Sequence, residues 1–211
     1  MTTAESLKRI GEDLLSQCPD WIKCGFRWPG TSEAYRVNVP AFTTEFLKLQ
    51  RLEYRLSTDG SILSASVFRI NEPLTIYDHK GVPSTYRAFQ ESILLDRTSS
   101  RDLRLIEMQE DSRHILARLH FHHPAPVEYR KAGQESTPRE REMECLAEYL
   151  LLPDSVLIPM MSHRGFEPFL PVRGTFSPKE EQLLHHMAAC LQISPATLIH
   201  RLKDAGFLEE Q

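Results

Sequence analysis

Residues 137–153, TPREREMECLAEYLLLP, form the stretch around which the rest of the chain is organised. Thr137 followed three residues later by Glu140 is a capping box, in which each side chain binds the backbone N–H of the other residue. Pro138 suits the first helical position, and Pro153 ends the helical pattern. The stretch therefore predicts a capped helix whose apolar side, rich in leucine, packs into a core.

The composition of the 211 residues indicates a packed globular protein of one domain, or of one domain with a small appendage. A formal net charge of −4 gives no general reason to expect nucleic acid. The four cysteines are scattered and form no CxxC pair, which argues against a disulfide framework and a thiolate zinc site. The first residues lack the apolar core of a signal peptide, and no run reaches membrane-spanning length. We therefore expect a cytoplasmic protein without membrane segments.

The first half of the chain predicts a helix followed by a small, mostly antiparallel sheet. Residues 3–17 have apolar residues on one helical face. Residues 52–56 alternate as a strand, and Asp-Gly within 58–61 predicts a hairpin turn to a partner strand at 62–70. Residues 74–77 predict a third strand.

The second half is predicted to be mainly helical. Residues 102–119 and 177–191 each begin with capping chemistry, and Ser194-Pro195 starts a last helix that Gly206 closes. Residues 125–136 are expected to form a polar loop. Residues 154–176 are expected to be a loop with short elements, because prolines and glycines interrupt them.

The helix expected at 102–119 carries two ionisable residues on an apolar face. Positions 103, 106, 110, 114, 117 and 121 share this face, and Glu110 and His114 are its polar members. A buried charge is costly unless it is paired or binds a metal. Two ligands four residues apart, with an acid directly after the first, have the geometry of HExxH zinc hydrolases. Here Glu110 replaces the first histidine, and Asp111 replaces the catalytic glutamate.

The organising stretch also resembles a signature of the ImmA/IrrE-like metallopeptidase family, roughly E-x-E-A-N-x-F-A-x-x-L-L-M-P. Glu140, Glu142, Ala147 and the run 150–153 match it, whereas Glu144 and Leu146 depart from it. The run 193–208 is similar to the family's closing helix, often V-S-x-x-A-L-x-x-R-L-x-x-L-G-L. The resemblance covers about residues 100–208.

The resemblance implies an α+β fold: a small, mostly antiparallel sheet packed with helices in a zincin-like metallopeptidase scaffold, with a helical C-terminal part. It implies that residues 1–98 supply the N-terminal helix and sheet of the same core. Residues 99–176 would form the metallopeptidase-like helical core, and residues 177–211 a closing helix-turn-helix-like element.

For the site, the resemblance implies metal ligands at Glu110, His114 and Glu140, with Asp111 as general base. The oxygen-rich set would suit Mn or Fe as well as Zn. Because the HExxH motif is broken, we expect a regulatory protein that cleaves or binds a protein partner, such as a transcriptional repressor. Altered or lost proteolysis, in a catalytically inactive relative, is the preferred interpretation.

Simpler interpretations remain open for each of these residues. Glu140 can serve only as the helix cap, Glu110 and His114 can form only an ion pair, and no metal need be bound. The cluster His120, His122 and His123 could bind metal or act as a cationic helix cap. A less favoured placement of HExxH on residues 118–122 would use His122 as the final histidine of the motif.

A different functional class is suggested by the last two helices. They could form a helix-turn-helix DNA reader, although no strong basic patch accompanies them, so nucleic acid is not the favoured partner. Cys145 lies alone in a helix and is expected to pack rather than react. The side chains expected to be exposed on this reader are Ser194, Thr197, His200, Arg201 and Lys203.

Overall fold

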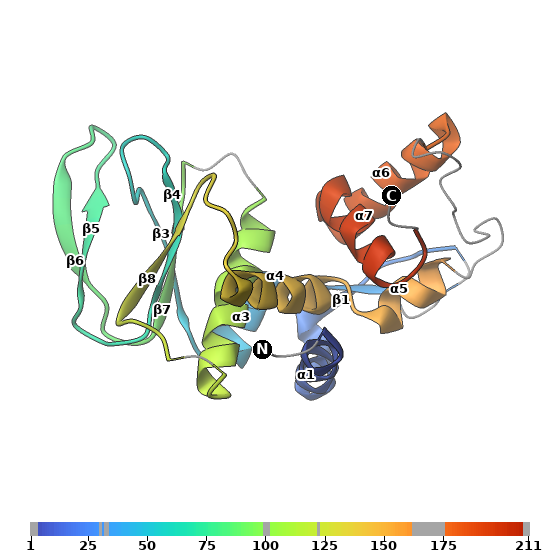
Figure 1. Cartoon of the computed structure of the whole chain (residues 1–211), viewed down its shortest axis with the longest axis horizontal. Coiled ribbons are helices and arrows are strands. Elements are labelled where there is room, and N and C mark those ends of the chain that lie inside the picture. Colours follow the sequence, from blue (N-terminus) through green and yellow to red (C-terminus); the bar gives the residue numbers. More distant parts are fainter. Residues whose placement is uncertain are drawn as a thin grey trace. The chain divides into compact units, whose positions relative to one another are not determined.

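The structure is a computed structural model of the chain. It describes residues 4–29, 31, 34–98, 102–121, 123–161 and 176–208. Two compact units divide the chain, and each is described by itself (Figure 1). Unit 1 comprises Met1–Ile10 and Val39–Ala147, and unit 2 comprises Gly11–Asn38 and Glu148–Gln211. Two helices contribute residues to both units: α1 (Ala4–Gln17) and α4 (Pro138–Leu151).

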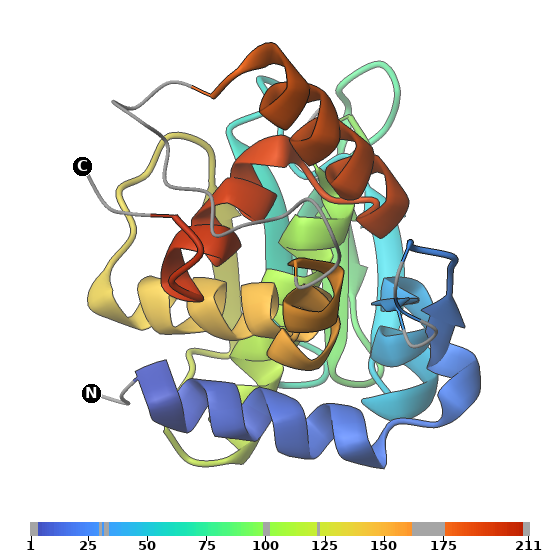
Figure 2. The ribbon, with the colours of Figure 1, turned by 90° about the vertical axis from the view of Figure 1, so that its right-hand side faces the viewer.

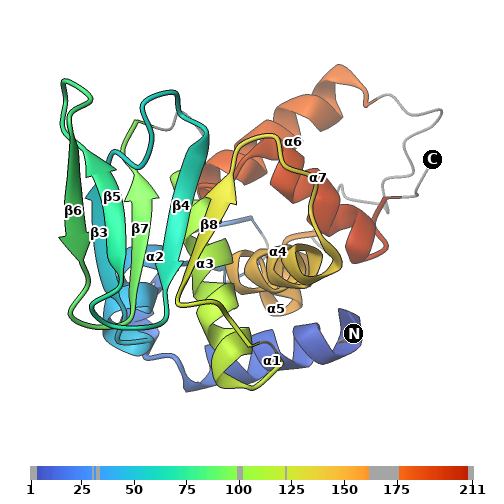
Figure 3. The ribbon, with the colours of Figure 1, turned by 60° about the vertical axis from the view of Figure 1, so that its left-hand side comes forward.

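Unit 1 is built on a four-stranded sheet with the order β3-β7-β4-β8 (Figure 3). Its strands are β3 (Gln50–Tyr54), β7 (Ser92–Asp96), β4 (Ile62–Val67) and β8 (Val127–Lys131). The β3–β7 pair is parallel, and the other two pairs are antiparallel. The expected α+β class and the mostly antiparallel sheet are thus confirmed.

One face of this sheet is covered by a hairpin made of β5 (Pro73–Tyr77) and β6 (Pro83–Arg87). Gly81 has a φ of +82° in the connecting turn, a conformation that glycine adopts without steric cost. The hairpin packs on the sheet through an apolar cluster. Its buried members are Leu56, Ala65, Val67, Leu74, Ala88 and Leu94.

The opposite face of the sheet carries α3 (Leu103–Arg118), as Figure 3 shows. Successive side chains of a strand point to opposite faces. Leu94 of β7 accordingly joins the hairpin cluster, whereas Leu95 packs with Ile106 of α3. Asp102 caps the helix by accepting hydrogen bonds from the backbone of the next turn. Ser99, expected to take part in this cap, lies outside the described residues.

Helix α3 is buried on all sides through its middle rather than along one stripe. Every residue from Ile106 to Leu116 is buried, whereas Phe121, expected on the core face, is 45% exposed. The expectation of a one-sided amphipathic helix is therefore wrong. Its polar residues must find partners inside unit 1.

The remaining elements of unit 1 are short. They are α2 (Val39–Ala41) and the π-helical turn η2 (Phe42–Phe46). Unit 2 contains a two-stranded antiparallel sheet and several helices, and α6 packs against α7 (Figure 2). Its elements are η1 (Asp20–Ile22), β1 (Lys23–Gly25), β2 (Tyr35–Val37), α5 (Asp154–Met161), α6 (Pro178–Leu191) and α7 (Pro195–Asp204).

Two expectations about the elements are wrong. The turn at 58–61 does not join neighbouring strands, because β7 lies between β3 and β4. The loop expected at 125–136 contains β8, which pairs with β4. The loop with short elements expected at 154–176 begins with one such element, the eight-residue α5, and residues 162–175 lie outside the described part. Within the part of the chain that is described, no helix is both long and apolar enough to cross a membrane.

Candidate functional site

Glu110, in the middle of α3, is fully buried and held by two serines of β4. The Ser64 hydroxyl donates to one carboxylate oxygen at 2.8 Å, and the Ser66 hydroxyl donates to the other at 2.5 Å. These serines alternate with Ala65 and Val67, so their hydroxyls face the helix while the apolar side chains face the hairpin. The pairing of β4 with β8 shifts register between Ile62 and Ser64, just before these serines.

Arg113 is 4% exposed and connects Glu110 to strand β8. Its Nε lies 3.1 Å from Glu110 Oε2, and its Nη1 donates to Glu128 Oε2 at 2.8 Å. Arg139 Nη1 lies 3.0 Å from the other oxygen of Glu128. Although burial acts in the opposite direction, the carboxylates of Glu110 and Glu128 raise the pKa of Arg113. We call Glu110, Arg113, Glu128 and Arg139, which alternate in charge, the ionic network.

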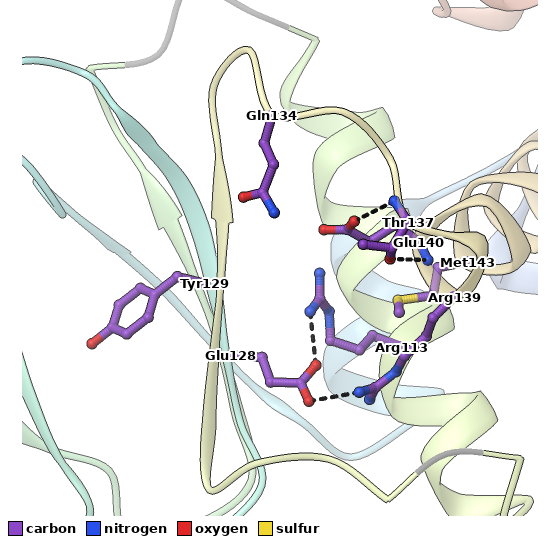
Figure 4. Close-up of a pocket in the computed structure, with 8 residues that line it drawn as sticks. All are labelled: Arg113, Glu128, Tyr129, Gln134, Thr137, Arg139, Glu140 and Met143. Carbon is purple, nitrogen blue, oxygen red and sulfur yellow. Dashed lines mark hydrogen bonds and ion pairs between the residues drawn. The ribbon is translucent and has the colours of Figure 1, made fainter.

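A cavity of about 260 Å³ lies beside this network, between β8 and the start of α4 (Figure 4). Within the described residues, Arg113 Nη2 and Arg139 Nη2 are buried without a hydrogen-bond partner. Figure 4 shows the Arg113 guanidinium lying between Glu128 and the side where Gln134 and Glu140 are found. The cavity is lined by Arg113, Glu128, Tyr129, Gln134, Thr137, Arg139, Glu140 and Met143.

Glu140 lines this cavity and also caps α4. Its carboxylate accepts a hydrogen bond from the Thr137 backbone at 2.8 Å, and its own N–H donates to the Thr137 hydroxyl at 3.2 Å. Partial burial raises the pKa of Glu140, but the hydrogen bonds from Thr137 outweigh it and lower the pKa overall. The expected capping box is thus confirmed.

His114 lies against an aromatic ring and not against Glu110. Its imidazole is buried, with its centroid 4.3 Å from that of Phe68, and its Nδ1 is 4.0 Å from a carboxylate oxygen of Glu91. Burial lowers the pKa of His114 to about 3, and the positive charges of Arg118 and Arg113 act in the same direction. The imidazole is therefore neutral near pH 7.

Asp111 points to a different neighbour, the turn η2. The Thr43 hydroxyl lies 2.8 Å from Asp111 Oδ2 and 3.1 Å from Glu107 Oε1. Burial raises the pKa of Asp111 well above its ordinary value. Because one hydroxyl carries a single proton, a protonated Asp111 would relieve the competition between the two carboxyl groups. Asp111 does not line the cavity that contains Glu140.

The predicted ligands Glu110, His114 and Glu140 are not brought together around one point. Among the described residues, the group whose ligand atoms all lie within 4.8 Å of one another is Glu148, His200 and Asp204 of unit 2. In this structure the predicted residues take part in an ionic network, an aromatic contact and a helix cap, and their role as metal ligands stays a prediction. The spacing of His200 and Asp204, four residues apart on α7, is the sequence signal that was missed.

The other candidate side chains have separate surroundings. His120 and His123 are exposed, and His122 lies outside the described side chains. Cys145 is half-buried and is not part of a disulfide bond. His186 stacks on Trp28 of unit 2 with ring centroids 5.5 Å apart.

The exposure expected for the DNA-reading face of α7 is partly wrong. Arg201 and Thr197 are buried. Arg201 donates to Asp154 Oδ1 at 2.8 Å and to the Leu152 carbonyl, so its charge is used inside unit 2. His200 and Lys203 are exposed as expected, and Asp204 is exposed beside them.

Stability should depend on pH through His114. The folded protein keeps this imidazole neutral down to about pH 3, whereas the unfolded chain takes up a proton near pH 6.5. Stability from this group is therefore complete above pH 6.5 and is lost as the pH falls from 6.5 toward 3, by about 1.4 kcal/mol per pH unit. Urea unfolding should show a steeper acid loss for the wild type than for His114→Gln. Parallel curves would contradict the assignment, and His185→Gln, at an exposed position on α6, is the matched control.

The three comparisons with known proteins found no relatives. No family model matches the chain, and neither a curated protein nor a solved structure matches it.

Proposed function

We propose that this chain is a diverged, catalytically inactive relative of the ImmA/IrrE-like metallopeptidases. It retains their zincin-like scaffold and binds a protein partner, such as a transcriptional repressor. The observation that supports this most is the place of Arg113, whose buried guanidinium lines the same cavity as Glu140. Glu140 stands at the position that the resemblance gives to the third metal ligand.

Helix α3 supports this interpretation when the HExxH motif is placed one residue earlier, on residues 109–113 and not on 110–114. The residue of α3 that shares the cavity with Glu140 is Arg113 and not His114. Placing HExxH on residues 109–113 retains Glu110 at the glutamate position. Gln109 and Arg113 then stand at the two histidine positions. A guanidinium remains protonated and has no lone pair for a metal, so this register loses an essential ligand.

The charge of Arg113 also takes over an electrostatic role of a metal ion. Its positive charge compensates the negative charges of Glu110 and Glu128. Without it, these two carboxylates would repel each other in a poorly solvated region. Proteolysis by zinc-activated water needs an open metal position with a water on it. The Arg113 guanidinium, held by two carboxylates, supplies neither the open metal position nor the bound water. This favours loss of ordinary zinc proteolysis.

A protein partner fits the chemistry beside the ionic network. Among the described strands, β8 pairs only with β4, so its other edge carries backbone groups that are not in the sheet. The buried N–H groups of Arg113 and Arg139 need acceptors. Peptide carbonyl groups supply acceptors of this kind, and an extended peptide supplies them in a row.

The experiment restores the lost ligands. The double variant Gln109→His/Arg113→His, made together with His200→Ala to disable the other ligand cluster, should gain one Zn²⁺ per chain by calorimetry. Zn²⁺ should also raise its melting temperature, because a ligand that binds only the folded state stabilises it. His200→Ala alone and Gln109→His/His200→Ala should gain neither. A folded triple variant that binds no more Zn²⁺ than these controls would contradict the proposed ancestry of the site.

DNA binding through α6 and α7 is the weaker alternative. DNA binding would need exposed basic side chains on these helices. Arg201, which was expected to be one of them, is buried and paired with Asp154. The exposed face of α7 combines Lys203 with Asp204, so it has no excess of positive charge.

A further inference from the structure

Three side chains that can bind a metal meet in unit 2. His200 Nδ1 lies 2.6 Å from Glu148 Oε2 and 3.8 Å from Asp204 Oδ2. One atom of each residue lies within 4.8 Å of the other two. We propose that Glu148, His200 and Asp204 form a binding site for a divalent transition-metal ion, with Zn²⁺ as its probe. This proposal goes beyond the proposed function and does not depend on it.

The spacing of the donor atoms suits a small tetrahedral ion. Ligand atoms at about 2.0–2.1 Å from Zn²⁺ are about 3.3 Å apart in a tetrahedron. The two distances from His200 Nδ1, 2.6 and 3.8 Å, lie on either side of this value. The shorter one is a hydrogen bond, which must open when the proton leaves and the metal enters. Small rotations of the Glu148 and Asp204 side chains therefore complete the geometry.

The secondary structure holds the donors in place. His200 and Asp204 are four residues apart on α7, so their side chains lie on one side of the helix. Glu148 comes from the second half of α4 and is largely buried, with 9% of its surface exposed. The proposed site thus has one ligand fixed by the interior and two on the surface of a helix.

The charge around the cluster favours a divalent cation. Arg201 is paired with Asp154 and Asp204, whereas Glu148 is paired with His200. Arg201 binds Asp154 at 2.8 Å and is 3.9 Å from Asp204. Its charge is therefore directed mainly at Asp154. A proton joins His200 Nδ1 to Glu148 in the 2.6 Å hydrogen bond, and a divalent ion that displaces this proton neutralises the carboxylates of Glu148 and Asp204.

The ion has a path to the site, and its coordination would remain open. The side chain of His200 is 56% exposed, so a hydrated ion can approach from solvent. Three protein ligands leave a fourth position for water, the arrangement of zinc sites that act on a substrate. One nitrogen and two oxygen ligands are also acceptable to Mn²⁺ and Fe²⁺.

The test is titration of the full chain with Zn²⁺ by calorimetry. We expect one ion per chain for the wild type. His200→Ala, Asp204→Asn and Glu148→Gln should each weaken binding by more than the about 10–100-fold that the loss of an outer-shell partner costs. Because His200 and Asp204 are exposed, their variants should remain folded by circular dichroism. His185→Ala, another exposed histidine of unit 2, should bind like the wild type.

Other outcomes would overturn the site. Absence of saturable one-to-one binding by the wild type would do so, as would unchanged binding by His200→Ala. Loss of binding in Glu140→Gln, with binding retained in His200→Ala, would instead place the metal at the cavity of unit 1. Because the restoration experiment uses a background without His200, failure of one proposal is distinguishable from failure of the other.

Discussion

Arg113→Ala should lower the free energy of unfolding by about 3–5 kcal/mol. The change removes the guanidinium that lies between Glu110 and Glu128. Glu110 is fully buried, and its other partners are neutral serine hydroxyls. Its carboxylate would therefore stay buried without a compensating charge, or would take up a proton at a cost. Urea unfolding followed by circular dichroism measures the loss.

Two further variants separate charge from packing. Arg113→Met together with Glu110→Gln removes both charges while retaining most of the volume, so it should recover most of the lost stability. Arg69→Ala removes an exposed arginine that lies 3.7 Å from Glu72, and this change should cost at most about 1 kcal/mol. A loss in Arg113→Ala as small as that in Arg69→Ala would show that the ionic network is not a structural support.

Arg201→Ala should have a comparable effect in unit 2, again about 3–5 kcal/mol. Arg201 is fully buried, binds Asp154 and the Leu152 carbonyl, and has its guanidinium carbon 4.2 Å from the centre of the Tyr149 ring. Alanine would remove a charged donor from the partly buried carboxylate of Asp154 and from the buried Leu152 carbonyl. Both tryptophans of the chain, Trp21 and Trp28, belong to unit 2, so tryptophan fluorescence reports its unfolding.

Arg201→Lys and Lys203→Ala are the matched variants on the same helix. A lysine keeps the charge but cannot make the forked contacts of a guanidinium, so an intermediate loss is expected. Lys203 is exposed, and its removal should change stability by no more than about 0.5 kcal/mol. If Arg201→Ala unfolded at the same urea concentration as Lys203→Ala, the buried contacts of Arg201 would not stabilise unit 2.

Helix starts could be predicted from the sequence, whereas strand neighbours could not. Thr137 and Ser177 cap α4 and α6 as expected, because a capping box needs only residues three positions apart. The turn at 58–61 reverses the chain, but local chemistry does not determine which strand lies alongside β3. At 154–176 only a loop with unspecified short elements could be predicted, because Pro159 lies inside α5 and the sequence after it is rich in prolines and glycines.

The candidate site could be predicted only in part, because local sequence patterns do not reveal partners that are distant in the sequence. Glu110 could be identified as a buried acid from its apolar neighbours on a helix. Its partners Ser64 and Ser66 lie 46 and 44 residues away in the sequence, and no local pattern connects them. Arg113 was missed because a one-sided helix would expose it, and α3 is buried on all sides.

The position of β7 between β3 and β4 has a consequence for how the chain folds. Gln50 pairs with Ser92, and Ser64 pairs with Leu95, so neither β3 nor β4 can complete its main pairing until the residues beyond 90 arrive. The β5–β6 hairpin, formed by a five-residue connection, can assemble early in the microsecond range. The sheet instead needs closures of long loops, which slow folding. A nascent unit 1 would therefore expose unpaired edges of β3 and β4 while the hairpin that follows β4 in the sequence is already formed.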